Sequence, residues 1–365
     1  MAIDFNRDRW DRVKAVHRQW WSGELDRPLF LLTSGGRDHG RIEPALRGRG
    51  FTSRYGLDTS VEAIVDRWDY DLSGQVFLGD GFPSVWPNFG PGVGAAFLGC
   101  EIENTEDSTW FKPREALPIR DLHLRYDRNN VWLRRIKDLM RVGCERWRGL
   151  VQMGMTDLGG NLDLIASFRP GEELLLDLTD EPDEVKRLTW EAHTLWWLYY
   201  DEIQRAGGGS NPGWSAWTAI FSETPYYMLQ CDFAYMLGPR MFDEFVKPEL
   251  AATCRRLDHA FYHLDGIGQL AHLDSLLSIP ELKGVQWVPG AGQPGVTQWP
   301  EVYRKIRKAG KLAQVFVNQD ESGFRLLDTL VKQVGSAEGI ALIGWVAPSD
   351  RGEAEDMMRR HGWRE

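Results

Sequence analysis

The spacing of apolar residues predicts that strands and helices alternate over most of the chain. From residue 128 onward, apolar stripes at spacings of three and four alternate with short apolar runs that are typical of buried strands. Helices are expected at 131–148, 182–206, 239–259 (kinked at Pro248), 267–278, 299–309, 321–334 and 350–360, and strands at 150–155, 214–220, 261–264, 284–287, 312–317 and 339–343. This repeated order predicts a parallel sheet, and the number of units favours a closed barrel over an open sheet.

The first third of the chain is less regular. Residues 1–27 predict one amphipathic helix, and the apolar run at 28–33 predicts the first buried strand. Residues 41–127 are rich in glycine and proline and predict an irregular insertion, with a hairpin within 96–110. We therefore expect a single α/β domain over 1–365: a (β/α)8 TIM barrel with an N-terminal helix at 1–27, an insertion at 41–127 near the barrel mouth and regular βα units over 128–360.

Charge and cysteine content exclude several classes of protein. The chain has 43 basic and 53 acidic residues, a net charge of −10, and no basic stripe with interleaved aromatics, so a nucleic-acid partner is not expected. No apolar run approaches the ~20 residues of a membrane span, and the charged N-terminus does not resemble a signal peptide. The four cysteines lack the spacing of a disulfide framework or a zinc ribbon. A cytoplasmic protein without a membrane partner is expected, and a homodimer is compatible with the sequence.

Tryptophan is the unusual component, with 17 residues in the chain. An indole ring combines a large apolar face with one N–H group that needs a partner. Stacking on a planar or sugar-like ligand is the functional interpretation, and packing in the core or between helices is the structural one. For any single tryptophan the structural interpretation is favoured.

Polar and aromatic side chains follow the predicted strands, where barrel enzymes build their active sites. The candidate catalytic residues are Asp157, Asp232, His263 and Asp265. The candidate substrate-binding residues are Arg37, His39, Trp86, Asn161, Glu223, Gln286, Trp287, Asn318 and Trp345. This density of polar groups at strand ends predicts an enzyme acting on a small-molecule substrate. The glycine-rich stretches at 90–94 and 288–292 lack the context of a phosphate-binding loop, so no nucleotide cofactor is expected.

His263 and Asp265 are two residues apart at a strand end and therefore point to the same side. They can serve as a base with its orienting carboxylate, or as ligands to a divalent metal such as zinc or manganese. A core histidine bonded to the backbone is the structural alternative for His263. For Asp232 the alternative is a cap on backbone N–H groups, and for Asp157 and Asn161 it is closure of a turn.

Residues 231–292 resemble the uroporphyrinogen decarboxylase-like superfamily. The similarity lies in Asp232-Phe233, in the block from Pro239 to Pro248 and in the tip His263-x-x-Gly266. It implies a barrel fold and kinship with the cobalamin-linked methyltransferases, and hence a methyltransferase-like enzyme with a corrinoid protein as a possible partner. In the zinc-dependent members the matching tip reads His-x-Cys-Gly, whereas here the third position is Asp265. Both sulfur ligands of that family are missing, so a metal would be held by nitrogen and oxygen.

Other functions stay open beside methyl transfer. A carbohydrate-active hydrolase or lyase would use the carboxylates at the strand ends for proton transfer and tryptophan rings for stacking. A tetrapyrrole decarboxylase is disfavoured, because Asp38 and His39 dilute the positive charge of Arg37 and Arg41 and the net charge opposes a polycarboxylate. A non-catalytic binding protein on the same fold would not need ionisable pairs at the strand ends.

Overall fold

A mostly parallel sheet forms the centre of the molecule in the computed structural model, which describes residues 3–318 and 320–364. The seven strands lie in the order β2–β1–β11–β10–β9–β8–β7. They are β1 (Leu29–Ser34), β2 (Val76–Gly79), β7 (Tyr226–Leu229), β8 (His259–Asp265), β9 (Leu282–Val288), β10 (Leu312–Phe316) and β11 (Ile340–Val346). All neighbours are parallel except β1 and β2, which pair antiparallel.

The strands from β7 to β11 lie side by side in chain order, and β1 follows β11. Parallel neighbours need a crossover between them, usually a helix. Connections between parallel strands are nearly always right-handed. When each strand lies beside the one before it in the chain, and always on the same side, the connecting helices therefore all cover the same face of the sheet. The structure therefore confirms the α/β class and the parallel sheet. Among the described residues, no ladder of hydrogen bonds joins β7 back to β2, so a closed barrel is not seen.

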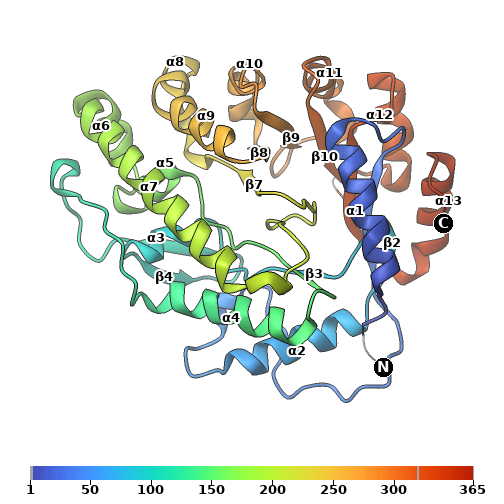
Figure 1. Cartoon of the computed structure of the whole chain (residues 1–365). Coiled ribbons are helices and arrows are strands. Elements are labelled where there is room, and N and C mark those ends of the chain that lie inside the picture. Colours follow the sequence, from blue (N-terminus) through green and yellow to red (C-terminus); the bar gives the residue numbers. More distant parts are fainter. Residues whose placement is uncertain (1–2, 319, 365) are drawn as a thin grey trace.

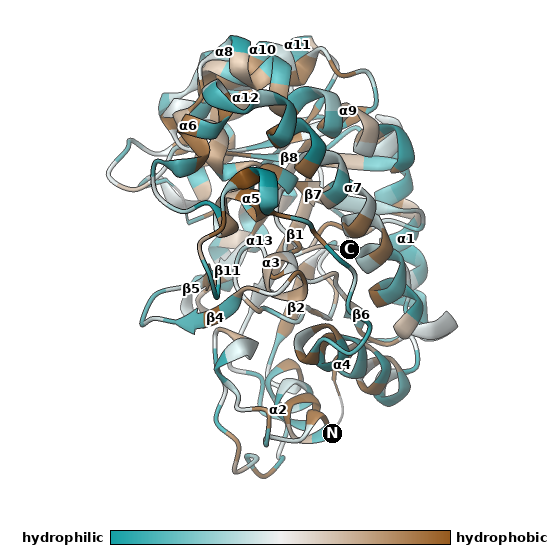
Figure 2. Cartoon of the chain, turned by 90° about the vertical axis from the view of Figure 1, so that its left-hand side faces the viewer, coloured by the Kyte–Doolittle hydropathy of each residue, from teal (hydrophilic) through white to brown (hydrophobic). Residues whose placement is uncertain are grey.

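Helices surround the strands, as Figure 1 shows. They are α1 (Arg7–Ser22), α2 (Val61–Ser73), α3 (Gly94–Phe97), α4 (Val131–Trp147), α5 (Asn161–Phe168), α6 (Glu173–Asp180), α7 (Pro182–Ala206), α8 (Pro239–Met241), α9 (Lys247–Arg256), α10 (Leu273–Leu277), α11 (Pro300–Lys308), α12 (Leu326–Val334) and α13 (Arg351–Arg360). Hydrophilic and hydrophobic residues alternate along these helices (Figure 2). In the part of the chain that the structure describes, no helix is both long and apolar enough to cross a bilayer.

Helix α1 packs against the N-terminal side of the strands. The indole N–H of Trp10 donates to the carbonyl of Leu150, 2.8 Å away, just before β6 (Gln152–Met153). The ring of Trp21 stacks on His259, the first residue of β8, at a centroid distance of 4.1 Å. These aromatic residues are the apolar stripe that predicted the helix. Since α1 occupies this side, a site for ligands belongs at the opposite ends of the strands.

The region 41–127 contains more regular structure than expected. It includes α2, the edge strand β2 and the short strand β3 (Ser84–Val85). Strand β3 pairs with β6 in a separate two-stranded parallel sheet. The predicted hairpin is present as β4 (Glu101–Asn104) and β5 (Thr109–Lys112). Local sequence gave a weak signal here because these strands are short and pair across long stretches of chain.

Two predicted elements differ from the structure. The strand expected over 214–220 is replaced by an irregular segment with one antiparallel bridge between Trp214 and Ser222, and the sheet strand is β7 instead. The single helix expected over 239–259 is divided instead: α8 leads into a π-helical turn, η5 (Phe242–Val246), and then into α9, which has Pro248 in its first turn. Proline has no N–H to donate to the preceding turn, and this favours a wider turn at that point.

Candidate functional site

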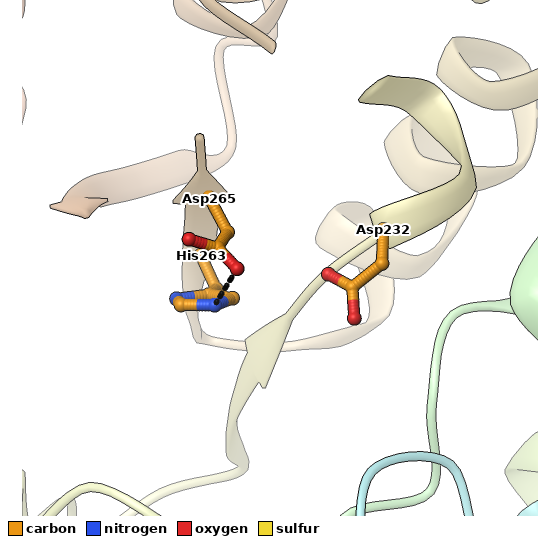
Figure 3. Close-up of side chains that lie close together, drawn as sticks. All are labelled: Asp232, His263 and Asp265. Atoms are coloured by element: carbon orange, nitrogen blue, oxygen red, sulfur yellow. Dashed lines mark ion pairs between the residues drawn. The ribbon is translucent and has the colours of Figure 1, made fainter. Parts of the chain in front are cut away.

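Three ionisable side chains meet at the C-terminal ends of β7 and β8. Asp232 follows β7 at the start of the 3-10 helix η4 (Asp232–Met236), and His263 and Asp265 lie at the end of β8. One ligand atom from each residue lies within 4.8 Å of the others. The Nε2 atom of His263 is 3.9 Å from a carboxylate oxygen of Asp265. Figure 3 shows Asp232 facing this pair from a separate segment. The three residues that the sequence grouped are therefore close together.

Asp163, in the first turn of α5, holds the segment that carries Asp232. Its two carboxylate oxygens accept hydrogen bonds from the backbone N–H groups of Asp232 (3.1 Å) and Phe233 (2.8 Å). The side chain of Asp232 makes no capping bond to η4. The capping role considered for Asp232 thus belongs to Asp163. Asp163 has no distinguishing signal in the sequence, because an acid in the first turn of a helix is ordinary.

The imidazole of His263 is fixed on two sides. Its Nδ1 atom forms a short hydrogen bond with Oε1 of Gln286, which lies beside it in the register of β8 and β9. The ring of Trp217 meets it edge-to-face, with centroids 5.0 Å apart. Only 15% of the His263 side chain is exposed. Trp217 was also missed by the sequence analysis, which assigned its segment to a strand.

Several carboxyl groups around the cluster have raised pKa values. Burial, together with the charge of Asp232, raises the pKa of Asp157 to about 7. Burial and the charge of Asp232 also raise the pKa of Asp163 to about 7. Asp232 lies at the open mouth, but the protein around it removes part of its hydration, and this raises its pKa against the opposing effect of His263. These neighbouring carboxyl groups therefore favour the binding of protons or of a cation at the site.

The contribution of Asp157 to the free energy of unfolding should fall as the pH rises from about 4 to about 7. The folded-state pKa of Asp157 lies above its unfolded value, so the unfolded chain releases this proton first and deprotonation favours unfolding. Stability linked to this group is fully present below the unfolded pKa and is lost as the pH passes the folded pKa. Urea denaturation of wild type and Asp157→Asn over this range measures the effect. The free energy of unfolding of Asp157→Asn should decline less steeply with pH than that of wild type. Asp180→Asn, which changes an exposed acid, is the control and should follow wild type. Equal slopes for Asp157→Asn and wild type would contradict the prediction.

Asp157 also closes a turn, as one of its oxygens accepts a hydrogen bond from Gly159 N (2.9 Å). The turn role considered from the sequence is therefore present, and the carboxyl is buried. Asn161 begins α5 and is buried, with no partner for its Oδ1 atom. Both residues lie in the connection that leads to Asp163 and hence to Asp232.

A pocket of about 630 Å³ opens beside the cluster. Asp265 lines one side of it and Asn318 another, with the loop at 288–295 between them. Asp320 also lines the pocket, and its carboxylate accepts bonds from Thr297 N (2.9 Å) and Ser322 N (2.9 Å). Burial raises the pKa of Asp320, but its hydrogen bonds to Thr297 and Ser322 outweigh this effect and lower the pKa. A volume of this size suits a small molecule. Asp265 is the residue that connects the pocket with His263.

Four other predicted residues lie elsewhere. Arg37 donates to the carbonyl of Ser73 (2.7 Å) at the end of α2, and His39 is buried edge-to-face against Tyr70 of the same helix. Glu223 pairs with Arg18 of α1, on the N-terminal side of the strands. Trp86 is half-buried after β3, beside Gly154. Of these, Glu223 is at the wrong end of the sheet for a substrate contact, because it precedes β7 rather than following a strand.

The two predicted stacking residues have different environments. Trp287 is fully buried and packs edge-to-face on Trp299, at a centroid distance of 5.5 Å. Strand β9 extends to Val288, so Trp287 lies within the strand and faces away from the side of Gln286. Trp345 is 49% exposed and lies against Gly35. Stacking on a ligand is therefore excluded for Trp287 in this conformation and open for Trp345.

Replacing Trp287 with alanine should destabilise the fold rather than alter ligand binding. The large cavity left in the core predicts a loss of about 3–5 kcal/mol in the free energy of unfolding. Trp345→Ala, which removes a half-exposed ring of the same size, should cost much less. Urea denaturation of both variants measures the difference, and similar losses would show that Trp287 is not a core residue.

The donor atoms at the cluster suit a divalent cation of intermediate hardness. One imidazole nitrogen and two carboxylates are a typical set for manganese, iron or zinc. The cysteines do not add to it, because all four are buried and burial raises the pKa of the Cys231 and Cys254 thiols. Among the described residues, the three that could hold a cation together offer nitrogen and oxygen ligands.

Comparisons with known proteins leave the family of this chain open. It matches no model of a known protein family, and no curated protein matches it either.

Proposed function

We propose that this chain is an enzyme that performs proton transfer on a small, polar, carbohydrate-like molecule, in a hydrolysis or an elimination. The observation that carries the proposal is the meeting of Asp232, His263 and Asp265 from separate strand ends beside the 630 Å³ pocket. A histidine with neighbouring carboxylates is a common acid–base arrangement. The raised pKa of Asp157 fits a second proton donor, because a group with a pKa near the working pH exchanges protons most readily.

In this proposal His263 removes a proton from the substrate through Nε2, and Asp265 stabilises the imidazolium that forms. Asp157 delivers a proton toward the leaving group, and Asp232 orients a substrate hydroxyl. If Nε2 of His263 instead bound a divalent cation together with Asp232 and Asp265, its lone pair would not be free to take the proton, and the cation would polarise a bound oxygen of the substrate. The chain's own groups thus account for both ends of the proton transfer.

Methyl transfer is the second candidate, and the resemblance of residues 231–292 to the methyltransferases of the uroporphyrinogen decarboxylase-like superfamily favours it. A corrinoid protein would then be the partner. The ligand set opposes it, because the three described residues that could hold a metal offer nitrogen and oxygen, which make a poor site for activating a thiol.

We also propose that the strands belong to a closed (β/α)8 barrel. Strands β3 and β6, together with β1 and β7 to β11, supply the eight that such a barrel needs. Two backbone bonds support the closure: Asp80 N donates to Phe30 O (2.7 Å), and Met155 N donates to Ser215 O (2.8 Å). The irregular segment at 214–222 would then lie between β6 and β7.

The proposal is tested by a substrate screen with purified protein. Neutral sugars, their glycosides and sugar acids are incubated at pH 7 with and without manganese, and products are followed by NMR. Conversion by wild type that is lost in Asp265→Asn and kept in Asp274→Asn, an exposed acid on α10, supports the proposal. Demethylation of methylated amines or ethers with no conversion of any sugar would favour methyl transfer instead.

A further inference from the structure

Gln286 was expected to contact substrate, but its side chain is fully buried. It lies in β9, directly beside His263 of β8, and Gln314 of β10 is its neighbour on the other side. Paired residues in adjacent strands point to the same face of a sheet. The three side chains therefore form a polar row across β8, β9 and β10, with His263 at the end nearest Asp232.

The row is closed toward the N-terminal side of the strands by apolar groups. Gly284 precedes Gln286 by two residues, and a Cβ atom there would lie 2.1 Å from the ring of Phe261. Phe261 in turn stacks on Trp20 of α1. Aromatic rings thus fill the layer below His263 and Gln286, so the polar row has no path toward α1.

The hydrogen bond between His263 and Gln286 sets where the imidazole proton lies. The Oε1 atom of Gln286 is a carbonyl oxygen and can only accept, so Nδ1 of His263 must donate. A neutral imidazole has one N–H, and its Nε2 then carries the lone pair. Nε2 is the nitrogen that faces Asp265, 3.9 Å away. A base or a metal ligand needs this lone pair.

The polar row is costly for the fold, which argues against a purely structural role. Nε2 of Gln286 and both amide atoms of Gln314 are buried and have no hydrogen-bond partner within residues 3–318 and 320–364, and unpaired buried amides destabilise a protein. Gln152 on β6 is equally buried, but it donates to the carbonyls of Met153 (2.8 Å) and Gly213 (3.1 Å). The amide of Gln152 stabilises the backbone around it, whereas the amide of Gln286 bonds to the side chain of His263.

We propose that Gln286 is a positioning residue that holds His263 as the Nδ1–H tautomer, with the Nε2 lone pair directed toward Asp265 and Asp232. The inference rests on the proposed function only where it says that this lone pair serves as a base or a metal ligand. The tautomer itself is a property of the resting protein and can be measured without substrate.

Long-range proton–nitrogen NMR correlations of the histidine ring measure the tautomer directly. Spectra are recorded at pH about 8.5, well above the ordinary histidine pKa of ~6.5, with His263 assigned from the His263→Ala spectrum. Wild type should show Nδ1 protonated. Gln286→Leu and Gln286→Met should shift the ring toward the Nε2–H form, whereas Gln286→Glu, which keeps an accepting oxygen, should retain the wild-type form. Gln314→Leu is the matched control and should leave the tautomer unchanged.

Manganese affinity gives a second measurement on the same proteins. Loss of the orienting partner should weaken binding by about 10- to 100-fold in Gln286→Leu and little in Gln314→Leu. An Nε2–H tautomer in wild type, or an unchanged tautomer in both Gln286→Leu and Gln286→Met, would overturn the inference. The Nδ1–H form in wild type together with no sugar conversion would leave Gln286 as a positioning residue and reject only the proposed reaction.

Discussion

Replacing His263 with alanine is expected to lower kcat/KM by about 10²- to 10⁴-fold, the usual contribution of a positioned acid or base. The substitution also leaves the buried Gln286 amide without its hydrogen bond from His263. The free energy of unfolding should therefore fall by about 1–3 kcal/mol, the usual effect of one unpaired buried polar group. Steady-state kinetics on a substrate found by the screen and urea denaturation measure the two quantities.

His17 of α1 supplies the matched control for this substitution, on the opposite side of the strands. It is buried, lies edge-to-face against Phe82 at 5.7 Å and bonds through Nδ1 to the carbonyl of Val13, 2.8 Å away. His17→Ala should therefore lose stability, with kcat/KM of the remaining folded protein near wild type. If His263→Ala likewise lost stability and kept its activity, the interpretation of His263 as a core histidine would be correct.

The regular part of the fold could be predicted from the sequence because its elements carry their own signal. Helix α7 begins at Pro182, has acids in its first turn and ends before three glycines, and these local features do not depend on the rest of the molecule. Strand β7 has no such signal. Its four buried residues and the apolar segment just before it look alike locally, and only pairing with β8 selects 226–229 as the strand.

The candidate site was predictable where side chains share a strand. His263 and Asp265 are two residues apart, so the period of a strand places them together. The same period could have corrected Trp287: if Gln286 faces His263, its neighbour must face the other way. Asp163 and Trp217 could not be found in this manner, because their positions depend on how the connections after β6 and before β7 fold over the site.

Replacing Asp232 with asparagine is expected to lower kcat/KM by about 10²- to 10³-fold and to weaken manganese binding in parallel, because the variant removes one of two carboxylates that face His263. Asp163 should act through the same residue. Asp163→Ala removes the two bonds that hold η4 and should displace Asp232, with a loss of about 10- to 100-fold.

A double-mutant cycle distinguishes a shared action from two separate ones. If Asp163 acts by placing Asp232, the double variant should be little worse than Asp232→Asn alone, because the residue to be placed no longer contributes its charge. Additive losses would show instead that Asp163 acts on its own or only through stability. Circular dichroism, urea denaturation and manganese binding on all four proteins separate these outcomes. If Asp163 acted only through stability, its loss as a cap on η4 should cost ~1–2 kcal/mol in the free energy of unfolding. Manganese binding by the folded protein would then be unchanged.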